Sequence, residues 1–222
     1  MVESMVRGEK MKDFPMFTTD FGVASLILKE VPYQGCAYII IRDALQPEEL
    51  LQECASFCRV CGAERIYATG HEILEEKPLY TALIEMRCAA ASLPDTDAAL
   101  FPVQERTLRQ WLDIYNQKIV SVPNGAWMTD GDGQKMLERG DGYFIHRGGQ
   151  LLGIGIADAD TIHWVASVRP GAGRDVVLAL AHAVTADAVS LTVASENKKA
   201  LKLYESLGFL KVKEISRWYR VA

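Results

Sequence analysis

The segment from Val193 to Phe209 constrains the fold more than any other part of the chain. It reads VASENKKALKLYESLGF, a β-rich stretch followed by a polar helix that ends at Gly208. Asn197 and Tyr204 lie two helical turns apart, so both project from one helix face, with the small Ala200 between them. This order predicts a strand, a helix and a second strand, the alternation typical of α/β folds.

A second strand-to-helix junction lies at residues 168–174, which read VRPGAGR. Glycines at 171 and 173 allow a tight turn, and the first turn of a helix presents free N–H groups and a positive dipole end. A phosphate or pyrophosphate is the natural ligand of such a junction, and Arg174 adds a charged donor. The alternative is an ordinary β–α turn that needs glycine only for its shape.

A strand followed by Asn-x-x-Ala-x-x-Leu-Tyr-x-x-x-Gly-Phe resembles the signature of the GCN5-related N-acetyltransferase (GNAT) superfamily. Residues 197–209 match this signature at every specified position, and the resemblance covers about Ala99 to Ala222. It implies an α/β fold, a GNAT-type mixed sheet flanked by helices. It also implies transfer of an acetyl group from acetyl-CoA to an amine, with coenzyme A as co-substrate and no metal, and it is compatible with a homodimer.

The resemblance also assigns the cofactor contacts. In this superfamily a Val-x-Pro segment ends the fourth strand, and a glycine-rich turn then binds the pyrophosphate of coenzyme A. The usual turn, Arg-Gly-x-Gly-x-Gly, is longer than the one here by about two residues, so fewer pyrophosphate contacts are expected. Backbone groups around the end of the strand would bind the pantetheine arm and polarise the thioester carbonyl, an oxyanion-type contact. The expected cofactor-binding residues are Ala166, Val168, Gly171, Ala172, Gly173, Arg174 and Asn197.

Tyr204 is implied as the catalytic group that hydrogen-bonds the departing thiolate. A phenol has a pKa near 10 and a thiol a pKa near 8.5. Complete transfer of the phenol proton to the thiolate is therefore unfavourable by about 1.5 pKa units, roughly 2 kcal/mol. We therefore expect a hydrogen bond without complete proton transfer. The alternative is a buried aromatic residue whose hydroxyl is satisfied within the protein.

A general base is harder to identify. An alkyl amine near pKa 10.4 is protonated at pH 7, and removing that proton costs about 4–5 kcal/mol. Many relatives keep a Glu on the strand before the cofactor turn, but residues 161–168 read TIHWVASV, with His163 as the only titratable side chain. His163 is therefore the candidate catalytic base, and Glu105 and Asp160 are weaker candidates. A histidine satisfied in the core or on the surface is the alternative, and a water chain or an amine of low pKa would need no base.

Composition excludes several other classes of protein. The chain has 222 residues, of which 49% are hydrophobic and 24% charged, so it is neither disordered nor of low complexity. A net charge of −5 lacks the basic surplus expected for nucleic-acid binding. Residues 1–14 contain no continuous apolar stretch, so no secretory signal is expected there, and no apolar run approaches the ~20 residues that span a bilayer. We expect a cytoplasmic protein with no membrane partner.

Cys54, Cys58 and Cys61 have the C-x3-C-x2-C spacing with which radical-SAM enzymes hold an iron–sulfur cluster. The same spacing is the i, i+4, i+7 repeat of one helical face, and Leu50 and Leu51 extend the apolar pattern. We interpret these cysteines as core residues. Zinc binding and a redox role are the remaining alternatives.

A Ser/Pro/Asp-rich cluster at residues 92–97 divides the chain into an accessory segment, 1–95, and an acetyltransferase segment, 96–222. The first is expected to contain a hairpin of strands at 22–29 and 36–41, a helix at 47–61, and strands at 64–69 and 80–89. The second is expected to contain helices at 105–120, 133–139, 175–184 and 197–207, and strands at 143–146, 151–157, 161–168, 188–194 and from 210. Segment 1–95 resembles a degenerate half of the same fold that extends the sheet or caps the substrate groove. An unrelated domain is the alternative.

The sequence as a whole thus predicts an acetyl-CoA-dependent N-acetyltransferase that acts on a small-molecule or peptide amine. The alternative is a non-catalytic CoA-binding sensor or interaction module that kept the fold. The shortened loop and the absence of a carboxylate on the strand at 161–168 motivate that alternative.

Overall fold

The computed structural model describes residues 15–222, which form two compact units. One unit comprises Ile84–Lys213 and the other comprises residues 15–83 together with Glu214–Ala222. The division expected from the sequence lies near residue 95. Residues 214–222 fall in the second unit because the last residues of the C-terminal strand pair with a strand of the first half of the chain. The expectation that no secretory signal is present concerns residues 1–14, which lie outside the described residues. No helix within residues 15–222 combines the length and the apolar character needed to cross a membrane.

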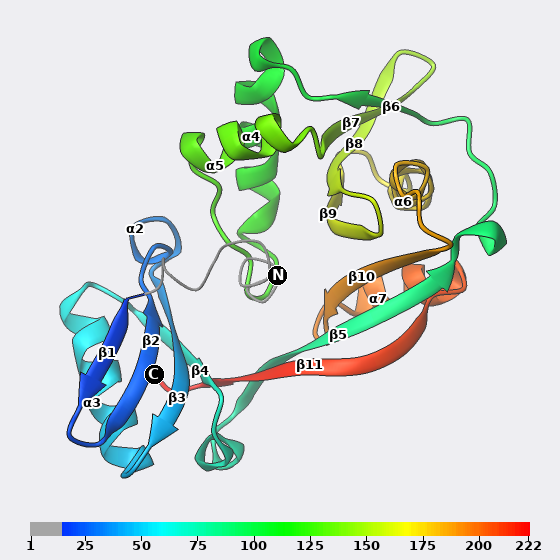
Figure 1. The fold of residues 1–222 in the computed structure, drawn as a ribbon. Coiled ribbons are helices and arrows are strands. Elements are labelled where there is room, and N and C mark those ends of the chain that lie inside the picture. The colour runs from blue at the N-terminus through cyan, green and yellow to red at the C-terminus, as the bar shows by residue number, and fades with distance from the viewer. Residues whose placement is uncertain (1–14) are drawn as a thin grey trace. The chain divides into compact units, whose positions relative to one another are not determined.

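The unit Ile84–Lys213 is an α/β unit built on a mixed sheet (Figure 1). Its strands run in the order β5-β10-β9-β8-β7-β6, with β11 beside β5. The elements are β5 (Leu79–Ala89), β6 (Ala99–Pro102), α4 (Glu105–Ile119), α5 (Asp130–Arg139), β7 (Gly142–Arg147), β8 (Gln150–Ala157), β9 (Thr161–Ser167), α6 (Gly173–Ala181), β10 (Ala188–Ala194), α7 (Lys198–Ser206) and β11 (Leu210–Arg220). The first residues of β5, up to Leu83, and the residues of β11 from Glu214 belong to the other unit. Strands β6 to β9 form an antiparallel meander, and α6 then connects β9 to the parallel strand β10.

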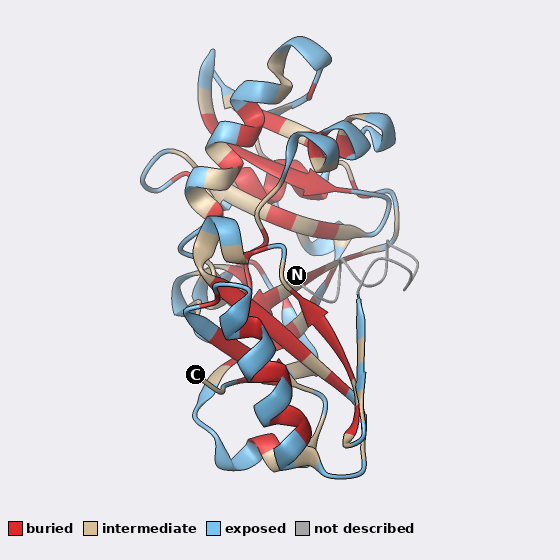
Figure 2. Ribbon diagram, turned by 90° about the vertical axis from the view of Figure 1, so that its left-hand side faces the viewer, coloured by how far each residue is buried: buried red, intermediate tan, exposed pale blue. Residues whose placement is uncertain are grey.

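Helix α4 packs its apolar face against one side of this sheet. The positions expected from the sequence to form that face include Trp111, Leu112, Tyr115 and Ile119, and all four are buried. Trp164 of β9 belongs to the same cluster, and its ring centroid lies 4.3 Å from that of Tyr115. Figure 2 shows the buried positions following the strands, while most helices carry them along one side. The helical period read from the sequence at 105–120 is therefore confirmed.

Helix α6 packs against the other side of the sheet at two glycines of β8. A Cβ atom at Gly153 would overlap the carbonyl oxygen of Ala166 and lie 2.7 Å from a methyl group of Val176. Gly155 is enclosed in the same way by Leu180. The close approach of α6 to β8 thus requires glycine, which has no side chain, at positions 153 and 155. This approach fixes where α6 begins relative to the end of β9.

Replacement of Gly153 by alanine is expected to destabilise the protein by about 1–3 kcal/mol, because the backbone oxygen of Ala166 has little freedom to move away. For a chain of this size that corresponds to a fall in Tm of about 2–4 °C per kcal/mol. Thermal unfolding followed by circular dichroism measures the change. Gly131→Ala is the matched control, since the nearest atom to its Cβ position lies 3.8 Å away and alanine favours the helix α5. An unchanged Tm for Gly153→Ala would contradict the packing argument.

The second unit consists mainly of N-terminal elements. They are β1 (Met16–Thr19), β2 (Gly22–Ile27), the one-turn helix α2 (Val31–Gln34), β3 (Cys36–Ala44), α3 (Pro47–Val60) and β4 (Arg65–Thr69), with a 3-10 helix at Glu72–Glu76. Strands β2 and β3 form the expected antiparallel hairpin, and β3 and β4 are parallel. The last residues of β11 pair with β4, with Tyr219 opposite Ala68, so the chain returns to this unit at its C-terminus.

The cysteine-rich helix α3 contributes to the core of this unit. Cys54 and Cys58 are buried in a cluster with Leu50 and Ile66, whereas Cys61 caps the helix and is exposed. Burial raises the pKa of the Cys54 thiol to about 11 and that of Cys58 to about 12. The packing interpretation is thus confirmed for the two buried cysteines, which are poor thiolate ligands.

Candidate functional site

Strands β9 and β10 are parallel neighbours that pair only at their beginning. The ladder consists of Thr161 opposite Ser190 and Ile162 opposite Leu191, and beyond these residues the two strands diverge (Figure 1). The remainder of β9 therefore has one edge paired to β8 and the other edge unpaired by any strand within residues 15–222. Free N–H and C=O groups on such an edge are ready to bind an extended ligand.

The second unit contains the same local order of elements, but its corresponding parallel strands do not diverge. There β2 and β3 are antiparallel, and α3 connects β3 to the parallel strand β4. The ladder between β3 and β4 pairs residues 36–40 with residues 65–69 without interruption. The divergence of β9 from β10 is therefore specific to one of two similarly connected strand pairs, which points to that pair as the site.

A β-bulge lies at the point where the two strands diverge. The partner of Ile156 on β8 is Trp164, whereas the partner of Ala157 is Ile162, so His163 is the additional residue. Bulges change the direction of a strand and often lie next to functional sites. The bulge places His163 beside the last residue that pairs with β10.

Beyond the bulge, alternate residues of β9 direct their backbone groups to opposite edges. The N–H of Val168 donates to the carbonyl of Leu152 on β8, at 2.9 Å. Ala166 lies two residues earlier, opposite Ile154, so its N–H also points toward β8. The N–H of Val168 is therefore already engaged with β8, and the N–H of Ala166 lies on the same side, so neither N–H faces the open edge. The groups that face the open edge belong to Val165 and Ser167.

The turn after β9 leads directly into α6, which begins at Gly173, two residues earlier than expected. Gly171 has φ 81°, a conformation that favours glycine, and no atom of the described part of the chain lies within 4 Å of its Cβ position. The N–H of Ala172 bonds to Arg169, and its side chain is buried. Within the described residues, no acceptor is found for the N–H groups of Gly171, Gly173 and Arg174. This helix start therefore presents several free donors, as the anion-site interpretation requires.

Three arginines lie around this helix start. Arg174 is exposed and forms no ion pair among the described residues, while Arg169 donates from Nε to the carbonyl of Leu151 at 3.2 Å. Arg147 lies 3.0 Å from the carboxylate of Asp175, in the first turn of α6. Asp175 would repel a phosphate, and this ion pair reduces that repulsion.

Helix α7 carries the two residues singled out by the sequence signature. Asn197 caps the helix, with its Oδ1 accepting from the N–H of Ala200 at 3.2 Å. Tyr204 is only 6% exposed, and its side chain lies in one apolar cluster with Val165 of β9 and Ala172 before α6. Burial raises the pKa of Tyr204 above its ordinary value. Its hydroxyl forms no hydrogen bond with any other described residue, so it is free to donate to a ligand.

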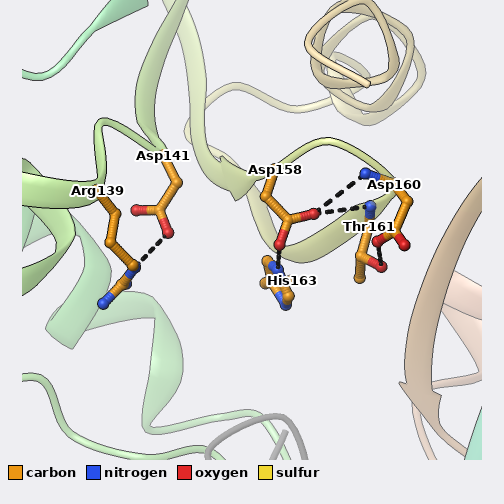
Figure 3. A network of polar contacts seen from close by, with 6 residues as sticks. All are labelled: Arg139, Asp141, Asp158, Asp160, Thr161 and His163. Atoms are coloured by element: carbon orange, nitrogen blue, oxygen red, sulfur yellow. Dashed lines mark hydrogen bonds and ion pairs between the residues drawn. The ribbon is translucent and has the colours of Figure 1, made fainter. Parts of the chain in front are cut away.

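His163 forms a short contact with Asp158, which lies in the turn between β8 and β9 (Figure 3). The Nε2 of His163 is 2.6 Å from Oδ2 of Asp158. The other carboxylate oxygen accepts from the N–H groups of Asp160 and Thr161, at 3.2 and 3.0 Å. Burial acts to raise the pKa of Asp158, and these hydrogen bonds outweigh it, so the pKa is lowered from its ordinary value of 3.8. Asp158 is therefore ionised at neutral pH.

The other carboxylates considered from the sequence have different surroundings. Glu105 is exposed in the first turn of α4. Asp160 is exposed and accepts from the hydroxyl of Thr161 at 2.5 Å. A further acid, Asp141, is buried and forms an ion pair with Arg139 at 2.6 Å (Figure 3). Asp158 is the one of these carboxylates that contacts His163.

Sequence reasoning missed Asp158, Arg147 and the backbone groups of Val165 and Ser167. Asp158 could have been found, because residues on either side of a short hairpin turn lie opposite one another and His163 follows that turn. The backbone groups of Val165 and Ser167 could not have been found, because their direction depends on a β-bulge that no sequence feature of residues 161–164 predicts. Arg147 is the last residue of β7, a strand with no unusual sequence feature, and its partner Asp175 is far along the chain.

Several solved structures share this fold. A conserved protein of unknown function from Staphylococcus epidermidis is 12% identical, with a TM-score of 0.58 over 94% of this chain and 93% of that one. A GCN5-related N-acetyltransferase from Kribbella flavida is 15% identical, with a TM-score of 0.54 over 98% and 92%. Another from Sphaerobacter thermophilus is 11% identical, with a TM-score of 0.54 over 89% and 75%. No family model and no curated protein matches the sequence. At these identities the similarity establishes the fold alone.

Proposed function

We propose that this chain, which has the fold of the GCN5-related N-acetyltransferases, transfers an acetyl group from acetyl-CoA to an amine. One observation carries the proposal. The open edge of β9 runs from His163, at the divergence from β10, to the free N–H groups at the start of α6. Such an edge suits a ligand with an extended polar arm and a terminal phosphate group.

The residues present are suited to coenzyme A. The N–H groups of Gly171, Gly173 and Arg174 would bind the pyrophosphate, and the Arg174 side chain adds a charge-assisted hydrogen bond. The open space around Gly171 admits the phosphate oxygens close to the backbone. The backbone groups of Val165 and Ser167 would bind the amides of the pantetheine arm, in place of the two residues first expected. Asn197 would orient the start of α7 beside this arm.

Two side chains would then handle protons and charge when the thioester supplies its acetyl group. An alkyl amine is an ammonium ion at pH 7, and removing its proton costs about 4–5 kcal/mol; His163 accepts that proton, so that the neutral amine can attack. Tyr204 donates a hydrogen bond to the departing sulfur. Because burial raises the pKa of this phenol, complete proton transfer to a thiolate is disfavoured, and the hydrogen bond alone stabilises the leaving group.

Calorimetric titration with acetyl-CoA and then with CoA is the first test. We expect micromolar binding of both, followed by release of free thiol when small-molecule and peptide amines are screened. Binding without thiol release from any amine would favour the alternative of a non-catalytic CoA-binding module. Absence of binding up to millimolar concentration would contradict the assignment of the site.

Replacement of Arg174 by alanine is expected to weaken CoA binding about tenfold, or ~1.4 kcal/mol, because an exposed guanidinium contributes one charge-assisted contact. Titration calorimetry measures the change. Arg59→Ala, at an exposed position of α3, is the matched control and should leave the affinity unchanged. Equal affinities for wild type and Arg174→Ala would exclude the phosphate contact assigned to this side chain.

A further inference from the structure

The carboxylate of Asp158 is fixed by its own turn before it meets His163. Its Oδ1 accepts from two successive backbone N–H groups, those of Asp160 and Thr161. These bonds set the direction of Oδ2, which lies 2.6 Å from Nε2 of His163 (Figure 3). The position of the carboxylate therefore depends on the turn and not on the histidine.

This contact determines which nitrogen of His163 carries the proton. An ionised carboxylate can only accept hydrogen bonds, so Nε2 must be the donor. In the neutral ring the second nitrogen, Nδ1, then has a free lone pair. The ring is also held in place from two sides, since His163 is the bulged residue of β9 and its Nε2 is bound to the β8–β9 turn.

We propose that Asp158 is a positioning residue that holds His163 in the tautomer protonated at Nε2 and leaves Nδ1 to accept the proton of the attacking amine. This inference rests on the proposed acetyl transfer. Nδ1 first takes one proton from the ammonium group, and the neutral amine nitrogen then forms its bond to the acetyl carbon as the carbon–sulfur bond breaks. The ring becomes an imidazolium whose Nε2–H remains bound to the Asp158 carboxylate, and the negative charge of that carboxylate stabilises it. The sulfur leaves as a thiolate, the nitrogen of the new amide loses its second proton to solvent, and the imidazolium returns its own proton to solvent.

A merely structural role for the same bond has different consequences. If Asp158 only connected the β8–β9 turn to β9, its removal would lower stability and change every kinetic constant through loss of folded protein. If it positions the base, its removal lowers kcat, leaves the affinity for acetyl-CoA unchanged, and is compensated by an added carboxylate.

The kinetic test compares Asp158→Ala with wild type. We expect kcat to fall by about 10²-fold, the range of general-base contributions, with KM for acetyl-CoA within about twofold. Sodium formate should restore part of the lost rate to Asp158→Ala but none to His163→Ala. Asp187→Ala, which removes an exposed carboxylate before β10, is the control and should keep the wild-type kcat. If Asp158→Ala is poorly folded, Asp158→Asn retains the shape and the turn acceptor, and should show the same loss of kcat.

A second measurement does not depend on activity. Long-range ¹H–¹⁵N spectra of the wild-type protein should show His163 protonated at Nε2 in its neutral form, with a downfield Nε2 proton that is absent in Asp158→Ala. Protonation at Nδ1 would overturn the inference even if the enzyme is active.

The outcomes separate this inference from the proposed function. A wild-type protein that binds CoA and acetylates no amine would overturn both. An active wild type whose Asp158→Ala and Asp158→Asn variants keep kcat within about twofold would overturn the positioning role alone. Formate rescue of Asp158→Ala, with none for His163→Ala, would support both.

Discussion

Replacement of His163 by glutamine is expected to lower kcat by about 10²–10⁴-fold at pH 7 for an alkyl amine substrate. Glutamine keeps a polar side chain at the bulge of β9 and can still reach Asp158 with a donor, but it cannot accept a proton. Binding of acetyl-CoA should not change, because the cofactor contacts are assigned to backbone groups and to α6. Steady-state rates of thiol release, together with calorimetric titration, measure the two effects separately.

The choice of amine provides the control for this prediction. An aromatic amine of low pKa is already neutral at pH 7, so the deprotonation that costs about 4–5 kcal/mol for an alkyl amine is not required. The effect of His163→Gln should therefore be much smaller for such an acceptor. An equal loss for both amines would indicate that His163 acts on something other than the amine proton, and no loss for either would remove it from the mechanism.

Replacement of Tyr204 by phenylalanine is expected to lower kcat by about 10- to 100-fold, which corresponds to the ~1.5–3 kcal/mol of a hydrogen bond to a charged group. The affinity for CoA should stay within about twofold, since the hydroxyl acts only when charge develops on the sulfur. The stability should also be unchanged or slightly higher, because this buried hydroxyl makes no hydrogen bond with the other described residues. Rate measurements, calorimetry and thermal unfolding follow the three quantities.

Tyr143→Phe makes the same chemical change on β7 and should leave kcat and CoA affinity unaltered. A fall in Tm for Tyr204→Phe with an unchanged kcat would mean that the hydroxyl is structural, the alternative noted from the sequence. A fall in CoA affinity as large as the fall in kcat would mean that Tyr204 binds the cofactor in the ground state instead of stabilising the leaving group.

The accessory segment illustrates a limit of local sequence patterns. Its hairpin, its helix from Pro47 and its later strands are all present, because each is encoded by its own period and turn residues. The edge strand β1 of this segment was missed, as was β6 of segment 96–222, since each spans only four residues and shows too little alternation to recognise. The role suggested for residues 1–95, the homodimer and the cytoplasmic location stay predictions.

The sequence by itself determined the α/β class, most helices and strands, the buried face of α4 and the helix that carries Asn197 and Tyr204. These features follow from patterns within short segments, where the spacing of apolar residues and the position of Asn, Pro or Gly decide the conformation. The residues proposed to bind phosphate were found for the same reason, since the two glycines and Arg174 lie within the four residues 171–174.

Only the tertiary structure decided which backbone groups of β9 are free and what His163 contacts. A strand edge is open or closed according to the pairing of its neighbour, and β3–β4 and β9–β10 differ in this respect despite the same order of elements. One additional residue, at His163, reverses the direction in which all later backbone groups of β9 point. The pairing of His163 with Asp158 likewise arises from a turn that brings the two side chains together, and no local propensity encodes a distance between them.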